Sequence, residues 1–264
     1  MKIALMDSGI GLLAAAAATR RLRPDADLVL SSDPDGMPWG PRTPAGITER
    51  ARAVARAAAA LGPDALIVAC NTASVHALAA LRAELEPGIP VIGTVPAIKP
   101  AAAAGGRVAI WATPATTGSP YQRGLIRDFA SGARVTEVPC PGLADAVEHG
   151  DEEAVARTVA AAAALTPADV TDVVLGCTHY ELVEESIRAA LAARTGGAEL
   201  VYHGSAEAVA VQALRRIGLE PAPDLPRTGG LTVLHSGRTS TLPGAALGYA
   251  EGRLLADRQQ VHQH

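Results

Sequence analysis

Two cysteines, Cys70 and Cys177, occupy matching settings in the sequence and have the chemistry to move a proton. Each follows a short apolar run, and each precedes small polar residues and then a segment long enough for a helix. A thiol has an unperturbed pKa of about 8.5, and a helix N-terminus can lower it. We therefore expect both thiols to act as bases at strand–helix junctions, with the helix start lowering the pKa of each.

Such a pair of thiols suits the removal of a very weakly acidic proton from the α-carbon of an amino acid. Interconversion of two enantiomers requires one base on each face of that carbon, with one base deprotonated and the other protonated at rest. Cys70 and Cys177 fit these roles if they lie on opposite walls of one cleft. The two cysteines therefore predict racemisation without metal or pyridoxal phosphate.

Polar residues near the cysteines are candidate acid–base partners. Asp7 directly follows the first apolar run and is expected to accept or relay the proton of Cys70. His179 lies two residues after Cys177 and is expected to do the same on the other side, while Glu148 is expected where a sheet edge faces the cleft. Donors that could hold carboxylates at helix N-termini come from Ser8, Asn71, Thr72 and Thr178.

Less specific interpretations compete with this one. A single cysteine at the end of a strand is most often a small buried hydrophobic residue, and we assign that role to Cys140. The cysteines lack Cys-x-x-Cys spacing, so a structural zinc site is not expected. The turn at residues 7–11 starts like a dinucleotide-binding fingerprint, but the third glycine is missing and no acidic residue ends the second expected strand.

Short apolar runs alternate with helix-length segments, a pattern typical of βαβ units and parallel sheets. Strands are expected at residues 3–6, 28–30, 65–69, 90–92, 107–111, 134–138, 172–175, 199–201 and 231–234. Helices are expected at residues 48–61, 73–85, 153–165, 181–194 and 205–217. Since ligands bind at the carboxyl ends of the strands in such sheets, residues that follow strands are placed at a site.

The sequence also repeats itself, because residues 65–72 and 172–179 share one plan of strand, cysteine, small polar residues and helix. Two pseudo-symmetric α/β lobes with mainly parallel sheets are the simplest architecture, with the active site in the cleft between them. The link near residues 96–100 is the expected boundary. A single continuous sheet is the alternative.

The composition is that of an ordinary globular protein, with 48% hydrophobic and 19% charged residues. A net charge of −4 argues against nucleic-acid and membrane-surface partners. Met1 is followed directly by an alternating apolar run, and no apolar run reaches membrane-spanning length. We therefore expect a cytoplasmic protein with reduced thiols.

Together these motifs resemble the glutamate racemases of the aspartate/glutamate racemase superfamily, in the same order and over nearly the whole chain. Asp7–Gly9 is similar to the opening motif of the family, and Cys70–Ser74 and Gly176–Tyr180 are similar to its two cysteine loops. Pro90–Gly93 is similar to the strand after the first loop, and Glu148 to an acidic residue of the family.

The resemblance implies a C-terminal segment that returns to the first lobe. The first lobe would then comprise residues 1–97 plus 204–264, and the second residues 98–203. It also implies cofactor-independent racemisation of L- and D-glutamate by a homodimer. The product D-glutamate would serve peptidoglycan synthesis, cell-wall biogenesis and cell shape.

Residue roles follow from the same resemblance. Cys70 would deprotonate the D-isomer and Cys177 the L-isomer, with Asp7, His179 and Glu148 as further catalytic residues. The substrate would contact eight residues, namely Asp7, Ser8, Trp39, Gly40, Asn71, Thr72, Thr178 and His179.

Two positions depart from the family pattern. Leu12 stands where a second glycine is usual, and Trp39 stands where the substrate-binding pair begins with tyrosine. A backbone contact from Trp39 would survive that change, whereas a contact from the phenol would not. Two other functions stay open, namely racemisation of another acidic amino acid such as aspartate, and a binding or regulatory protein without turnover. The presence of both cysteines and their partners argues against the latter.

Overall fold

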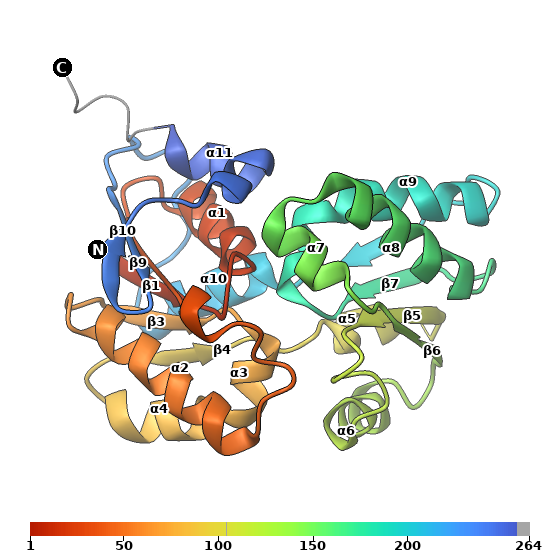
Figure 1. Ribbon diagram of the computed structural model, residues 1–264, viewed down its shortest axis with the longest axis horizontal. Helices are drawn as coiled ribbons and strands as arrows, with labels where there is room; N and C mark the ends of the chain where they lie inside the picture. The colour runs from red at the N-terminus through yellow and green to blue at the C-terminus, as the bar shows by residue number, and fades with distance from the viewer. Residues whose placement is uncertain (104, 258–264) are drawn as a thin grey trace. The chain divides into compact units, whose positions relative to one another are not determined.

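The computed structural model describes residues 1–103 and 105–257, and the described residues form an α/β structure with mainly parallel sheets (Figure 1). They divide into two compact units, one of residues 1–95 and 206–257 and the other of residues 96–205. Each unit contains its own sheet, so the expected fold class is confirmed and the alternative of one continuous sheet is wrong.

The first unit contains a six-stranded sheet of order β10-β9-β2-β1-β3-β4, in which only the β9–β10 pair is antiparallel. Its strands are β1 (Lys2–Met6), β2 (Asp27–Ser32), β3 (Ala65–Val68), β4 (Val91–Gly93), β9 (Leu231–His235) and β10 (Arg238–Ser240). Its α-helices and 3-10 helices are α1 (Leu12–Leu22), η1 (Pro34–Gly36), α2 (Pro44–Ala59), α3 (Asn71–His76), α4 (Leu78–Leu85), α10 (Ala206–Arg216), η3 (Gly244–Gly248) and α11 (Ala250–Ala256).

The second unit contains a four-stranded parallel sheet of order β6-β5-β7-β8. Its strands are β5 (Arg107–Ala112), β6 (Arg134–Pro139), β7 (Asp172–Leu175) and β8 (Val201–His203). Its helices are α5 (Ile98–Ala102), α6 (Pro120–Phe129), α7 (Leu143–His149), α8 (Glu152–Leu165), η2 (Thr178–Val183) and α9 (Glu184–Arg194). The order of these four strands repeats the order β2-β1-β3-β4 of the first sheet, so the repeat seen in the sequence is also a repeat of topology.

Helices cover both faces of the first sheet. Alternate side chains of each strand point to opposite sides, so the apolar side chains of a strand need a covering layer on each side. Ala4 and Met6 belong to an apolar cluster with Ile47, Ala51 and Val54 of α2. The opposite face packs against α1 and α10. The alanine-rich helix α1 is buried along nearly its whole length, between the sheet, α10 and α11. Small alanine side chains permit this close packing on several sides of one helix.

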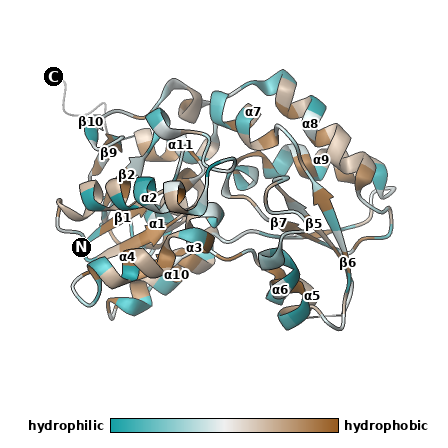
Figure 2. Ribbon diagram, turned by 60° about the horizontal axis from the view of Figure 1, so that its bottom comes forward, coloured by the Kyte–Doolittle hydropathy of each residue, from teal (hydrophilic) through white to brown (hydrophobic). Residues whose placement is uncertain are grey.

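The second sheet is covered in the same way. One face of the sheet belongs to an apolar cluster that includes Ile98 and Ala101 of α5. Leu125 and Ile126 of α6 pack against this cluster. On the other face, the indole Nε1 of Trp111 donates to the Thr166 hydroxyl at the end of α8 at 3.0 Å. In Figure 2 the strands of both sheets are largely brown, while the helices carry teal residues as well. No helix in residues 1–103 and 105–257 is long and apolar enough to cross a membrane.

Most strands and helices lie where the sequence predicts them, with three informative differences. Strand β8 (Val201–His203) overlaps the strand expected at residues 199–201 by one residue only. The single helix expected at residues 73–85 is divided into α3 and α4 at Ala77. The hydroxyl of Thr48 donates to the carbonyl of His76 at 3.0 Å, which gives that carbonyl a partner on α2. The short strand β10 was not predicted, because its three residues are polar and largely exposed and show no apolar alternation.

The C-terminal segment joins the first sheet through β9, and a buried arginine on α1 fastens it there. The guanidinium of Arg20 donates from Nη1 to the carbonyls of Pro24 and Ala26 at 3.1 and 2.7 Å. Its Nη2 donates to the carbonyl of Gly230 at 2.7 Å, directly before β9. Arg20 is only 4% exposed and Ala26 is fully buried, so the Ala26 carbonyl has little access to water as an alternative donor.

Replacing Arg20 is therefore expected to destabilise the protein. Arg20→Met should lower the free energy of unfolding by about 3 kcal/mol, because the buried Ala26 carbonyl loses its charged donor and the hydrogen bond to Gly230 is also lost. Urea unfolding followed by circular dichroism measures this difference. Arg21→Met is the matched control, since Arg21 is the next residue of α1 and is exposed. Equal unfolding free energies for the two variants would show that the buried contacts do not fasten the segment.

Candidate active site

Asp7 and Ser8 form the turn that follows β1. Asp7 is fully buried, and its N–H donates to the carbonyl of Ser31 on β2 at 3.1 Å. Its carboxylate Oδ1 accepts from the N–H of Ser8 at 2.6 Å and from the Ser8 hydroxyl at 3.3 Å. The carboxylate is thus held in a defined orientation at the carboxyl end of the sheet.

Cys70 lies two residues after β3, at the position that precedes the first turn of α3. It is 6% exposed, and burial raises the pKa of its thiol well above the ordinary value. The negative charge of Asp7, which also accepts a hydrogen bond from the thiol, raises this pKa further, while the N–H groups of Ala73 and Ser8 act in the opposite direction.

The start of α3 does act to lower the Cys70 pKa, as expected, but the net pKa is raised. Desolvation and the adjacent carboxylate outweigh the N–H donors at the start of α3. A raised pKa favours the protonated form of the Cys70 thiol, and the Asp7 carboxylate lies beside it. Asn71 and Thr72 form the first turn of α3 next to Cys70, the former buried and the latter partly buried.

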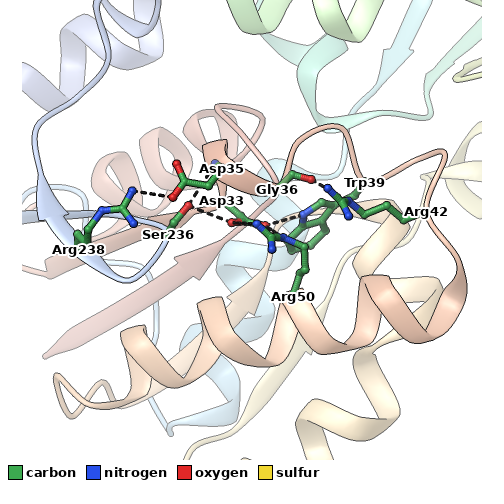
Figure 3. Close-up of polar contacts among 8 residues, drawn as sticks. All are labelled: Asp33, Asp35, Gly36, Trp39, Arg42, Arg50, Ser236 and Arg238. Carbon is green, nitrogen blue, oxygen red and sulfur yellow. Dashed lines mark hydrogen bonds and ion pairs between the residues drawn. The ribbon is translucent and has the colours of Figure 1, made fainter.

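Trp39 and Gly40 lie in the loop between η1 and α2. The Trp39 side chain is 2% exposed and belongs to the apolar cluster under α2. Its indole Nε1 donates to Oδ2 of Asp33 at 2.9 Å (Figure 3). Gly40 is exposed. The Trp39 side chain is therefore directed into the core of the first unit.

Asp33 is a residue that the sequence analysis missed. Strand β2 extends to Ser32, two residues further than expected, so an acidic residue does follow the second strand. The statement that none ends this strand was therefore wrong. The carboxylate of Asp33 accepts from Trp39, Arg50 and Ser236, and these protein donors occupy the oxygens that a dinucleotide ribose would need. An aspartate directly after a strand was the available signal.

In the second unit, Gly176 and Cys177 follow β7. The N–H of Gly176 donates to the carbonyl of Trp111 on β5 at 2.8 Å. A Cβ atom at position 176 would lie 2.7 Å from that same carbonyl oxygen, so glycine is required for this close approach. Cys177 precedes η2 as Cys70 precedes α3, and it is less buried than Cys70.

His179 connects Cys177 to a carboxylate. Its Nδ1 lies 3.9 Å from the Cys177 sulfur, and its Nε2 lies 2.9 Å from Oε2 of Glu148. Glu148 lies on α7 and not at a sheet edge, so its expected location was wrong although it does reach the cysteine loop. With Nε2–H donating to the carboxylate, the lone pair of Nδ1 faces the thiol. Thr178, between Cys177 and His179, is buried.

Cys140 is a packed core residue, as predicted. It is 1% exposed, and its thiol donates to the carbonyl of Val138 at 3.4 Å. Burial, and secondarily the charge of Cys177, raises its pKa to about 12. The hydroxyl of Tyr180 donates to the Cys140 carbonyl at 3.3 Å, which packs η2 against the end of β6.

The predicted residues therefore assemble in two groups, one in each unit. The first contains Asp7, Ser8 and Cys70, and the second contains Cys177, His179 and Glu148. Within residues 1–103 and 105–257, no group of three or more histidine, cysteine, aspartate and glutamate side chains is arranged to hold a metal ion.

Known proteins resemble this chain in sequence. The Asp/Glu/Hydantoin racemase family matches residues 11–213. The chain is 40% identical over 192 residues to the glutamate racemase of Roseiflexus sp. (strain RS-1), covering 71% of this chain and 70% of the relative. It is 39% identical over 183 residues to that of Pseudomonas putida (strain W619), covering 67% and 69%.

A solved structure shows the same likeness over more of the chain. The crystal structure of Escherichia coli glutamate racemase with L-glutamate and the activator UDP-MurNAc-ala is 27% identical, with a TM-score of 0.77 and coverage of 94% of this chain and 91% of that one. The family match, the identity to curated relatives and the shared fold agree, and this chain belongs to the Asp/Glu/Hydantoin racemase family.

Proposed function

We propose that this protein interconverts L- and D-glutamate by proton transfer to and from the thiols of Cys70 and Cys177. The observation that carries the proposal is the repeated placement of the two cysteines. Each follows the third strand of the order shared by the two sheets, and each has an acid–base group beside it. A protein that only bound the amino acid would need neither thiol nor proton acceptor at these positions.

In the direction from D-glutamate, Cys70 acts as the base. Its thiol first passes its proton to Asp7, whose carboxylate already accepts a hydrogen bond from it. The resulting thiolate removes the α-proton, and the Cys177 thiol gives a proton to the opposite face of the carbon. Cys70 then holds the substrate's proton, Asp7 still holds the proton it accepted, and Cys177 is left as a thiolate. Loss of the Asp7 proton to solvent and uptake of a proton from solvent by Cys177 restore the starting state.

In the direction from L-glutamate, the roles reverse. His179 accepts the proton of Cys177 through Nδ1, and Glu148 stabilises the resulting imidazolium through Nε2–H. The Cys177 thiolate removes the α-proton, while Cys70 supplies a proton from the other face. A positioned base of this kind contributes roughly a hundredfold to ten-thousandfold to a proton-transfer step.

Glutamate is the proposed substrate because the curated relatives bear that name and the Escherichia coli structure contains L-glutamate. We assign substrate contacts to the two cysteine loops and to the turn after β1. Hydroxyl and amide groups of Ser8, Asn71, Thr72 and Thr178 are suited to hold carboxylates there, with the backbone of Trp39 and Gly40. The acid–base groups named here are all side chains of the chain itself, and the mechanism requires no bound cofactor.

The resemblance to glutamate racemases supports a cytoplasmic homodimer that supplies D-glutamate for peptidoglycan. Aspartate is the competing substrate. Circular dichroism of the purified protein with each enantiomer of glutamate and aspartate, after dialysis against a chelator, distinguishes the two. Loss of the glutamate signal with either enantiomer supports the proposal, whereas change with aspartate alone would contradict it.

Substitution of the cysteines tests the pair. Cys70→Ala and Cys177→Ala should each abolish racemisation, because one base cannot serve both faces of the α-carbon. Circular dichroism of each glutamate enantiomer measures the loss, and the far-ultraviolet spectrum of the protein verifies the fold. Cys140→Ala is the matched control, since Cys140 is a buried thiol of the second unit without a proposed catalytic role. Near wild-type turnover after either active-site change would exclude the two-thiol mechanism.

The charge of Asp7 should be visible in the titration of Cys70. Asp7→Asn should lower the pKa of this thiol, because it removes a negative charge that disfavours the thiolate, while burial keeps the pKa above its ordinary value. Ultraviolet absorbance of the thiolate against pH, with Cys140 and Cys177 both changed to alanine, follows Cys70 alone. Asp35→Asn, at an exposed aspartate of the same unit, should leave the titration unchanged. An unshifted or raised pKa in Asp7→Asn would refute the contact.

The two partners should act on opposite directions of the reaction. Because the equilibrium between enantiomers stays at unity, kcat/KM must fall equally in both directions in any variant. The asymmetry therefore appears in kcat and KM taken separately and in primary isotope effects. Asp7→Asn should enlarge the isotope effect mainly with α-deuterated D-glutamate, and His179→Asn mainly with L-glutamate. Identical changes from both sides in both variants would mean that the two supports are not divided between the faces.

A further inference from the structure

We propose that Asp33 is a positioning residue that fixes the backbone of Trp39 and Gly40 for substrate binding without touching the substrate. This inference rests on the proposed function, because it assigns a role to Asp33 through a contact that the racemase reaction uses. It concerns the first unit only.

Four hydrogen bonds converge on the Asp33 carboxylate from three segments of the chain (Figure 3). Oδ2 accepts from the Trp39 indole at 2.9 Å and from Nε of Arg50 at 2.6 Å. Oδ1 accepts from Nη2 of Arg50 at 3.3 Å and from the Ser236 hydroxyl at 3.0 Å. The loop carrying Trp39, helix α2 and the β9–β10 turn thus meet on one side chain.

The backbone of Asp33 extends the connection to the turn after β1. Its N–H donates to the carbonyl of Ser8 at 3.1 Å, and its own carbonyl accepts from the N–H of Gly36 at 2.9 Å. Gly36 in turn accepts from Nε of Arg42 at 2.8 Å. Asp33 therefore links the Asp7–Ser8 turn to the start of the loop that contains Trp39 and Gly40, and Gly36 links that start to Arg42 near the end of the loop.

The packing around Asp33 leaves little freedom for the loop. A Cβ atom at Gly36 would lie 1.9 Å from Oδ2 of Asp33 and 1.8 Å from Nε of Arg50. Asp33 is 3% exposed, and Arg50 supplies the positive charge that a buried carboxylate needs. The Trp39 side chain has an apolar body in the core and a single polar atom, and that atom is bound to Asp33.

The chemical consequence is a pre-organised backbone. If residues 39–40 contact the substrate through main-chain groups, the loop must hold those groups in place before the substrate arrives, or binding must bear the ordering cost. Loss of the Asp33 contacts should weaken binding of the substrate and of the transition state alike. Such a loss raises KM and leaves kcat nearly unchanged. A residue that only stabilised the fold would not produce this division.

Two substitutions test the contact from its two sides. Asp33→Asn places an amide N–H₂ among donors, and Trp39→Phe removes the indole N–H while keeping an aromatic ring in the core. Asp33→Asn should raise KM for both enantiomers about tenfold with kcat little changed, as expected for loss of a hydrogen bond to a charged group. Trp39→Phe should raise KM in the same way, and the double variant should be no worse than Asp33→Asn alone.

Arg238→Gln is the matched control, because Arg238 pairs with Asp35 beside the cluster, is exposed and does not contact the loop. Its kinetics should equal those of the wild type.

A second readout does not depend on activity. In a Trp111→Phe background, Trp39 is the only tryptophan, since the chain has two. Asp33→Asn should then make its fluorescence more accessible to quenching by acrylamide.

The outcomes separate this inference from the proposed function. If Asp33→Asn folds and its KM is unchanged, or if only its kcat is reduced, the positioning role is overturned. If Asp33→Asn does not fold, Trp39→Phe decides, and an unchanged KM there overturns it. If the wild-type protein racemises no acidic amino acid, both the proposed function and the role of Asp33 in substrate binding are wrong. The quenching experiment would then still show whether Asp33 holds Trp39.

Discussion

The parallel register of three neighbouring strands is the constraint on which the rest of the first unit depends. Met6 of β1 pairs with Ser31 of β2 and with Val68 of β3, so the three strands end at one level of the sheet. Asp7, Asp33 and Cys70 follow these strands, and they therefore lie at the same carboxyl end of the sheet although they are far apart in the sequence. A slip of one residue in either pairing would turn these side chains to the opposite face of the sheet.

The same constraint explains the repeat. In the second unit, β5 pairs with β6 and β7 in the arrangement of β1 with β2 and β3, and Cys177 follows β7 as Cys70 follows β3. The environments of the two thiols nevertheless differ. Cys70 is buried beside a carboxylate that raises its pKa, whereas Cys177 is more exposed and is connected to a carboxylate through an imidazole. Two similar folds thus place different acid–base groups beside their cysteines.

Tryptophan at position 39 has a structural explanation in this fold. Its indole needs a partner for one N–H and space for a large apolar body, and the cluster under α2 and the carboxylate of Asp33 provide both. The side chain is therefore directed into the core of the first unit. Leu12, the other departure, begins the buried helix α1, where its side chain contributes to packing.

The sequence by itself determined the fold class, the repeated strand–cysteine–helix plan and the local grouping of His179 with Cys177, because apolar periodicity and short spacings carry that information. It did not determine that Glu148 reaches His179 from α7, that the Cys70 pKa is raised or that Asp33 connects Trp39 to Ser8. These facts depend on burial and on contacts between segments distant in the chain, such as Asp33 with Ser236. Only the tertiary structure decided them, because desolvation and the meeting of distant donors with one carboxylate arise when the strands pair and the helices cover the sheet.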